Sequence, residues 1–346
     1  MADSKTNQKV VLVAMGVDSP ALAGLIAYAK EKGNWRLVGN TENCATGLET
    51  LRKTGQKADG VLAYIYNFKD AHAVKESGLP AVNLSASVDG MGFPRVCSDD
   101  YAIGQVAAEN LMAKNYQRLA IYWLPYLVYS SRRRDGFVET VRKAGRTVEE
   151  FRALTHDITV GSSEYRDLLD WLTKLRKPIG IFADSDRKAR EIIQACAELQ
   201  LKIPEDVAVL GVDNVEALCE LCDPSLSSIT KQDFQSGYQA AELLDKMMEG
   251  QKVSENTEIL LPPVKIVQRA STDMLGIDSK KIATATKYIK ENIHRRFKIE
   301  DIVRDLSVSR RWLQRGFNQW LGVTPLQYIN QMRVERVKEY LNSEKK

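Results

Sequence analysis

The feature that most constrains the fold is an alternation, repeated along residues 10–270, of short apolar runs with helix-like segments. Apolar runs of strand length with helices between them indicate parallel sheets that are covered on both faces. The predicted strands are 10–15, 35–38, 60–66, 79–83, 118–123, 178–183 and 207–212, and the predicted helices include 21–32, 46–54, 132–144 and 187–199. A chain of 346 residues is too long to fold around one small hydrophobic core. We therefore predict two α/β lobes, each built on a doubly wound parallel sheet.

Short polar residues stand where the predicted strands end, and ligands of such sheets bind at that edge. Carboxylates accept hydrogen bonds from adjacent hydroxyls and arginine donates to two oxygens, so this set suits a polyol. The candidate ligand-binding residues are Asp18, Ser19, Asp99, Arg133, Asp184 and Asp213. A second interpretation stays open, in which the Asp and Ser residues only cap the helices that follow. No glycine pattern for a phosphate cradle is present in the sequence.

Charge is divided unevenly along the chain, although the net value is only +4. Residues 274–346 hold 16 Lys and Arg against 8 Asp and Glu, a net of +8. The other residues therefore hold 49 − 16 = 33 against 45 − 8 = 37, a net of −4. An acidic body with a basic tail indicates a nucleic-acid partner.

Several other classes of protein are disfavoured by the composition. The polar first nine residues and the short run 10–15 do not form a signal peptide, and no run is long enough to span a membrane. Five scattered cysteines favour reduced thiols, and the three histidines have no metal-ligand spacing. We therefore expect a cytoplasmic protein with no metal, no cofactor and no membrane partner.

The basic tail has the outline of a helix-turn-helix, with helices predicted over 280–294, 298–306 and 310–321 and an N-cap at Ser309. In the third helix Leu313, Gly316, Phe317 and Trp320 share one apolar face. The candidate DNA-binding residues on the other side are Arg310, Arg311, Gln314, Arg315 and Asn318. Arginine suits guanine and Gln or Asn suits adenine, so this face could read base edges while Arg310 holds phosphate. A solvated basic helix face is the plain alternative.

Motifs in the body resemble the LacI/GalR-type periplasmic-binding-protein fold. The motifs are Asp184-Ser-Asp186, the stretch 203–213, Pro224-Ser-Leu-Ser-Ser-Ile229, Arg133-Arg-Asp-Gly-Phe137 and Asp99-Asp-Tyr-Ala-Ile-Gly104. The resemblance covers residues 10–270 and implies a type I, two-lobed sensor whose effector contacts fall on Asp99, Arg133, Asp184 and Asp213. Many members have Asn at the position of Asp184, so the direction of that hydrogen bond stays open.

Motifs in the tail are similar to the first half of an AraC/XylS-type DNA-binding domain. They are 308–317, Gly322-Val-Thr-Pro-Leu-Gln-Tyr328 and 333–341. The resemblance places base-reading positions on Arg311, Gln314 and Arg315 and a linker helix over 324–342. Members of that family carry a second helix-turn-helix after the linker helix, and we expect this chain to lack it.

A LacI-type sensor ahead of an AraC-type tail is similar to xylose-operon regulators, and Pro262-Pro-Val264 and Arg269-Ala-Ser-Thr-Asp273 at the junction support that match. The resemblance implies a sensor over 8–271, a DNA-binding domain over 278–346, a pentose effector, most simply D-xylose, a double-stranded operator and a homodimer. Activator or repressor stays open. The sequence also allows two other interpretations. One is a sugar-binding module without regulatory action. The other is an enzyme with paired carboxylates, which is disfavoured because no Ser, Cys or His stands in a nucleophile setting.

Overall fold

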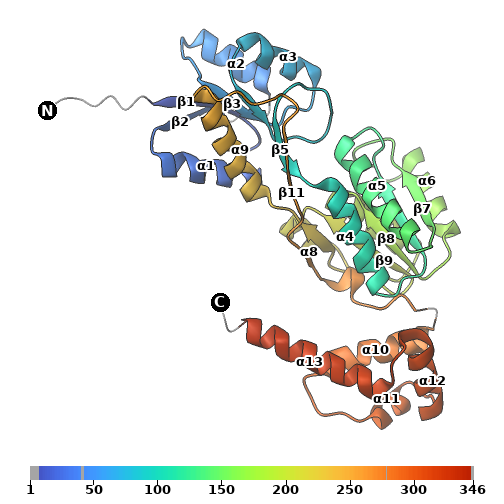
Figure 1. Ribbon diagram of the computed structural model, residues 1–346. Coiled ribbons are helices and arrows are strands. Elements are labelled where there is room, and N and C mark those ends of the chain that lie inside the picture. The colour runs from blue at the N-terminus through green and yellow to red at the C-terminus, as the bar shows by residue number, and fades with distance from the viewer. Residues whose placement is uncertain (1–7, 40–42, 278, 344–346) are drawn as a thin grey trace.

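The protein consists of two α/β lobes followed by an all-α domain, as the computed structural model shows (Figure 1). The structure describes residues 8–39, 43–277 and 279–343. This architecture confirms the predicted fold class. Residue 278, where we placed the start of the DNA-binding domain, and the last three residues of the chain lie outside the described residues.

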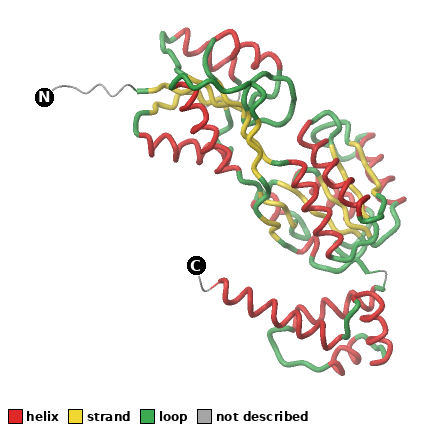
Figure 2. The backbone as a smooth tube through the Cα atoms, in the orientation of Figure 1, coloured by secondary structure: helices red, strands yellow, loops and turns green. Residues whose placement is uncertain are grey.

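The first lobe is a parallel sheet between two helical layers (Figure 2). In spatial order its strands are β11 (Glu258–Leu261), β5 (Arg95–Ser98), β4 (Ala81–Asn83), β3 (Gly60–Ala63), β1 (Lys9–Ala14) and β2 (Trp35–Gly39). One face is covered by α1 (Pro20–Lys32) and α9 (Asp233–Met248), and the other by α2 (Cys44–Lys53) and α3 (Phe68–Ser77).

The second lobe has the same architecture, a sheet between two helical layers, except that β12 pairs antiparallel with β10 at the edge of the sheet. In spatial order its strands are β12 (Lys265–Val267), β10 (Ser227–Thr230), β9 (Val207–Val212), β8 (Ile179–Ala183), β6 (Leu119–Trp123) and β7 (Val148–Arg152). Helices α4 (Asp100–Ala113) and α5 (Val128–Lys143) cover one face, α6 (Ser163–Lys174) and α7 (Asp186–Glu198) cover the other, and α8 (Glu216–Leu221) follows β9.

Alternation of side chains along each strand explains the continuous apolar runs. In β1, Val11 and Val13 pack under α1 and α9, whereas Leu12 and Ala14 pack under α2 and α3. All four are almost fully buried, because both faces of a parallel sheet are covered. The apolar runs predicted as strands are therefore core on both sides.

The chain passes between the lobes at residues 98–100, 230–233 and 261–265. The last two passages return the chain to the first lobe for α9 and β11 and then to the second lobe for β12. One edge strand of each sheet, β11 in the first lobe and β12 in the second, is therefore contributed by residues late in the sequence. The loops that follow β9 and β10 carry Asp213 and Lys231, whose side chains lie 3.0 Å apart beside these passages.

The all-α domain contains α10 (Lys280–Asn292), α11 (Ile299–Asp305), α12 (Arg310–Leu321) and α13 (Pro325–Ser343). The apolar face predicted for the third helix is confirmed, because Leu313, Gly316 and Phe317 are buried and pack in one core with Ile282 and Ile302. The predicted cap is also present, since the Ser309 Oγ accepts a hydrogen bond from the Trp312 amide.

Two features are absent from the part of the chain that the structure describes. None of its helices is both long and apolar enough to cross a bilayer. Its His, Cys, Asp and Glu side chains form no cluster that could hold a metal ion.

Candidate ligand cavity and nucleic-acid interface

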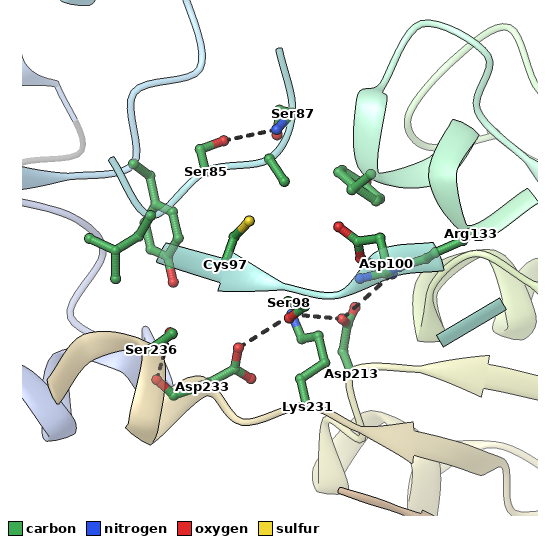
Figure 3. Close-up of a pocket in the computed structure, with 14 residues that line it drawn as sticks. Ser85, Ser87, Cys97, Ser98, Asp100, Arg133, Asp213, Lys231, Asp233 and Ser236 are labelled. Atoms are coloured by element: carbon green, nitrogen blue, oxygen red, sulfur yellow. Dashed lines mark hydrogen bonds and ion pairs between the residues drawn. The ribbon is translucent and has the colours of Figure 1, made fainter. Parts of the chain in front are cut away.

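A polar cavity of about 250 Å³ lies between the two lobes (Figure 3). That volume is just below the roughly 300–1,000 Å³ of typical small-molecule sites, so the cavity suits a small ligand. Its lining comes from both lobes and from the hinge, and consists of Tyr64, Leu84, Ser85, Ala86, Ser87, Cys97, Ser98, Asp100, Tyr129, Arg133, Asp213, Lys231, Asp233 and Ser236.

Arg133 is the cation on the second-lobe side of the cavity, and it projects from the second turn of α5. Its Nε donates to Asp100 Oδ1 at 2.8 Å, and its Nη1 lies 4.0 Å from Asp213 Oδ1. The guanidinium also lies over the Tyr129 ring, 4.9 Å from its centroid. Burial by itself would lower the pKa of Arg133, but Asp100 and Asp213 outweigh it and hold the pKa above its ordinary value. The side chain is therefore charged and fixed in place.

Lys231 is the second cation, and it lies in the hinge passage between β10 and α9. Its Nζ lies 3.0 Å from Asp213 Oδ1 and 3.5 Å from Asp233 Oδ1. Burial opposes its charge, yet these two carboxylates raise the pKa of Lys231. Figure 3 shows Lys231 between Asp213 of the second lobe and Asp233 of the first. Because the lysine bridges the lobes, lobe movement must alter one of its two ion pairs.

The loop that carries Asp213 has an unusual backbone. Asp213 has φ 107° and Asn214 φ 51°, values that non-glycine residues rarely adopt. The loop is held from behind, because Asp186 accepts from the Val215 amide at 2.9 Å and Ser228 Oγ accepts from the Asn214 amide at 3.0 Å. Backbone strain of this kind persists where surrounding contacts fix it, and it gathers at ligand sites.

The structure brings together only part of the predicted ligand set. Arg133 and Asp213 line the cavity. Asp18 is exposed beyond the cavity lining, and Ser19 is one contact away, since its Oγ lies 3.1 Å from the hydroxyl of the lining residue Tyr64.

The carboxylates of Asp99 and Asp184 point elsewhere. Asp99 accepts from the Ala102 amide and so caps α4, which is the helix-cap interpretation that the sequence left open. Asp184 is fully buried outside the lining and accepts from the Ser130 hydroxyl and the Leu124 amide. The neighbouring Asp100, which we did not predict, takes the place in the cavity that we had given to Asp99.

Sequence reasoning missed the hinge residues and the first-lobe serines of the site. Lys231 directly follows β10, so, like the predicted residues, it stands where a strand ends. The strand Ser227–Thr230 is mostly polar, however, and lacks the apolar run by which the other strands were predicted. Ser85 and Ser87 follow β4 within a loop that has no motif. For Lys231 the missing signal was therefore the strand, whereas for Ser85 and Ser87 the strand 79–83 was predicted and the loop after it gave no signal.

Backbone contacts close the lobes on each other beside the cavity. The Val128 amide donates to the Ser87 carbonyl at 3.0 Å, and the Tyr129 amide donates to the Ala86 carbonyl at 2.9 Å. Val128 is the first residue of α5, whose N-cap Leu127 supplies no side-chain cap. The first two amides of this helix are therefore capped by carbonyls of the other lobe.

The arrangement suits a small neutral polyol. The two cations face three carboxylates, Asp100, Asp213 and Asp233, so an anionic ligand would meet an excess of negative charge. Carboxylates and serine hydroxyls accept hydrogen bonds from sugar hydroxyls, and arginine and lysine donate to sugar oxygens.

A second candidate interface lies on α12. The side chains that we predicted to face DNA line one shallow exposed hollow, which consists of Arg310, Arg311, Gln314, Arg315, Asn318 and Gln319. Arg310 pairs with Glu300 of α11 at 3.0 Å, and both side chains are largely exposed. An exposed helix with arginine and amide side chains on one face is the geometry that reads base edges in a major groove.

Family comparisons agree with this division of the chain. Residues 108–272 match the periplasmic binding protein-like domain, and residues 289–330 match the bacterial regulatory helix-turn-helix proteins of the AraC family. The inter-lobe cavity and the exposed α12 face therefore belong to a DNA-binding transcription regulator that carries a periplasmic-binding-protein-like sensor.

Relatives define the family more closely. The chain is 30% identical to the xylose operon regulatory protein of Haemophilus influenzae over 290 residues, which are 82% of this chain and 75% of the relative. It is 28% identical to that of Escherichia coli strain K12 over 297 residues, 82% and 74% of the two chains. The chain belongs to this family of xylose operon regulatory proteins, and it is a sugar-responsive DNA-binding transcription regulator.

Solved structures confirm the fold. A xylose-binding transcription activator superposes with a TM-score of 0.70 at 24% identity, and the match covers 96% of this chain and 88% of that one. The lac repressor dimer bound to operator superposes on the sensor lobes with a TM-score of 0.61 at 20% identity, over 77% and 82% of the two chains.

Proposed function

We propose that this regulator senses a pentose, D-xylose, in the inter-lobe cavity. The observation that carries the proposal is the convergence of Arg133 and Lys231 on Asp213 in a polar cavity of about 250 Å³. Sugar hydroxyls would replace the contacts that these charged groups now make with one another. The names of the relatives from Haemophilus influenzae and Escherichia coli, and that of the solved xylose-binding activator, point to the same sugar.

Ligand contact is proposed for Arg133 and Asp213 first, because both line the cavity. Ser19 would act through Tyr64, and Asp99 and Asp184 would act by fixing α4 and the start of α5 around the sugar. Closure on the ligand would favour the state in which the lobes are in contact, and the change would reach the DNA-binding domain as a population shift.

The test is titration calorimetry with D-xylose, preceded by a thermal-shift panel of pentoses and hexoses. D-xylose should raise the melting temperature by mass action, and Asp213→Ala and Arg133→Ala should abolish binding. Asp157→Ala, an exposed carboxylate outside the cavity lining, is the control and should bind as the unaltered protein does. If a hexose stabilises the protein and no pentose does, the xylose assignment fails. Unchanged binding in both cavity variants refutes the site.

The α12 face is proposed to read the operator through Arg311, Gln314, Arg315 and Asn318, while Arg310 holds phosphate. Selection from a randomised duplex pool would supply the operator. Arg315→Ala should then cost about 1–3 kcal/mol of discrimination at one base position, and Arg310→Ala should weaken all sequences alike. Equal losses for both variants on every sequence would leave α12 as a phosphate-binding helix only.

We further propose that the regulator acts as a homodimer in the cytoplasm, where its DNA partner lies. The support is the lac repressor dimer, whose sensor lobes share this fold. Sedimentation equilibrium at micromolar concentration, with and without D-xylose, measures the state directly, and a monomer under both conditions contradicts the proposal.

A further inference from the structure

The connector between the sensor and the DNA-binding domain begins at Arg269, in the motif Arg269-Ala-Ser-Thr-Asp273. It contains the 3₁₀ helix Ala270–Thr272 and continues to Ile277 (Figure 1). Met274 and Ile277 are buried in the core of the all-α domain, with Ile282 and Phe317. Any displacement of the connector is therefore a displacement of the DNA-binding domain.

The guanidinium of Arg269 reaches back to the ligand loop. Its Nη1 donates to the Asn214 side-chain oxygen at 3.0 Å and to the Leu226 carbonyl at 2.9 Å, and its Nε pairs with Glu220 of α8 at 2.6 Å. The Arg269 side chain is only 10% exposed. Asn214 directly follows Asp213, the carboxylate that lies between Arg133 and Lys231 in the cavity.

The backbone of the connector is fastened to β9, β10 and the segment just before β10 in the second lobe. Ser227 Oγ accepts from the Arg269 amide at 2.8 Å and donates to the Arg269 carbonyl at 3.0 Å. Ser271 Oγ donates to the Val209 carbonyl of β9 at 2.6 Å, and the Ser271 amide donates to the Ser225 carbonyl. Further along, the Gly276 amide donates to the Lys114 carbonyl at the end of α4. These contacts fasten the connector to the surface of the second lobe, so a change in that surface reaches the connector.

Asp213 and Asn214 are the part of that surface that can change. Both have positive φ, and the loop is kept in that conformation by Asp186 and Ser228. This backbone conformation is costly for residues other than glycine. A new binding partner for Asp213 can therefore shift the loop to a different backbone conformation. The Asn214 side chain would carry that change to Arg269.

We infer that Arg269 is a positioning residue that couples the Asp213–Asn214 loop to the DNA-binding domain, so that ligand binding at Asp213 alters how tightly the connector is held. The inference rests on the proposed function for its ligand. It assigns the junction motif a role in the regulation of the site, besides its role as a linker. Asn214 is the contact through which the signal passes, and Glu220 is a support on the far side of the guanidinium.

The first measurement uses the full-length protein without sugar. Amide hydrogen exchange of Ser271, Asp273 and Gly276 is compared in the unaltered protein, Asn214→Gly, Arg269→Met and the double variant. Glycine tolerates the positive φ of Asn214, so Asn214→Gly removes the acceptor without adding backbone strain. Loss of a hydrogen bond to a charged donor should speed connector exchange roughly tenfold in Asn214→Gly. Arg269→Met also loses the contacts with Leu226 and Glu220, so its exchange should be at least as fast, and the double variant should exchange as Arg269→Met does.

Two matched variants separate coupling from a structural effect. Asn214→Asp keeps the side-chain acceptor for Arg269 and should restore slow exchange. Glu220→Gln weakens the ion pair at Nε and leaves the contact with Asn214, so its exchange should stay near that of the unaltered protein. If the effects of Asn214→Gly and Arg269→Met simply add in the double variant, or if Asn214→Asp exchanges as fast as Asn214→Gly, the coupling is refuted.

The second measurement adds saturating D-xylose. The sugar should change connector exchange in the unaltered protein and leave it unchanged in Asn214→Gly, although calorimetry still detects binding to that variant. An equal response of both proteins would overturn the inference and leave the proposed function intact. Absence of D-xylose binding to the unaltered protein would instead overturn the proposed function, while the sugar-free exchange of the variants would still decide whether Arg269 holds the connector through Asn214.

Discussion

Replacing Val128 by proline should weaken sugar binding by holding the lobes apart. Val128 begins α5, and its amide donates across the cleft to the Ser87 carbonyl at 3.0 Å. Proline is favoured at the first position of a helix, and the extended backbone of the preceding Leu127 (φ −106°, ψ 127°) is the conformation that proline requires before it. The substitution therefore removes one inter-lobe donor and leaves the helix itself intact.

The size of the effect follows from that geometry. One backbone hydrogen bond contributes about 0.5–1.5 kcal/mol, which corresponds to roughly 2- to 13-fold in affinity if the bond forms only in the closed state. The proline Cδ would also occupy the place of the amide hydrogen, and a carbon cannot approach the Ser87 oxygen as closely as that hydrogen does. We therefore expect D-xylose to bind at least about tenfold more weakly to Val128→Pro.

Calorimetry with D-xylose measures the affinity, and thermal unfolding without sugar checks that the second lobe is intact. The control is Ser163→Pro, which places proline at the first position of α6 on the second lobe after an N-cap, Ser162, that also has extended backbone. It should bind sugar as the unaltered protein does. If Val128→Pro melts normally and binds D-xylose with unchanged affinity, the inter-lobe cap does not contribute to closure and the reasoning is refuted.

Two further substitutions test the packing and the electrostatics of the site. Gly136→Ala would place a Cβ 2.0 Å from the Tyr101 carbonyl oxygen of α4, so α5 must shift, and urea unfolding should show a loss of about 1–3 kcal/mol together with weaker sugar binding. Burial and the nearby Asp213 raise the pKa of Asp186 to about 6, from an ordinary value of 3.8. Its stabilising contribution is therefore full below pH 3.8 and is lost as the pH rises through about 6. Relative to Asp186→Asn, the unaltered protein should lose about 3 kcal/mol of stability over that range, and parallel pH curves for the two proteins would contradict the shift.

The fold could be predicted from the sequence because the strong signals were local. The strand 207–212 and the helix 310–321 were predicted with the bounds that the structure shows, since one is a continuous apolar run and the other has a serine cap and one apolar face. Weak signals failed for a physical reason. The strand Val148–Arg152 lies at the edge of its sheet, and three of its five residues are charged, with Glu149 and Arg152 exposed, so it does not have the continuous apolar pattern that buried strands show.

The site was harder to predict because a carboxylate at a strand end can either cap the following helix or face the ligand cavity. Asp99 and Asp100 are adjacent in sequence, and either could have faced the cavity. In the structure Asp99 is the N-cap, with non-helical backbone, and its side chain turns back to the Ala102 amide, whereas Asp100 is the first residue of α4 and accepts from Arg133. Whether a carboxylate can reach Arg133 depends on how closely α5 packs against α4. That packing is part of the tertiary structure, and it is set by the close contacts at Gly104 and Gly136.

The hinge residues show why ligand sites of this fold are only partly visible in sequence. Lys231 and Asp233 enter the cavity because the chain returns to the first lobe after β10, an event that no local pattern records. That return is also what makes Lys231 responsive to closure, since its two carboxylate partners belong to different lobes. Arg132 of α5 lies inside the second lobe and also reaches across, since its Nη2 lies 3.4 Å from Glu258 of β11 in the first lobe. Lys231 differs from Arg132 in that it belongs to a passage between the lobes and lines the cavity itself, so its ion pairs respond both to lobe movement and to the ligand.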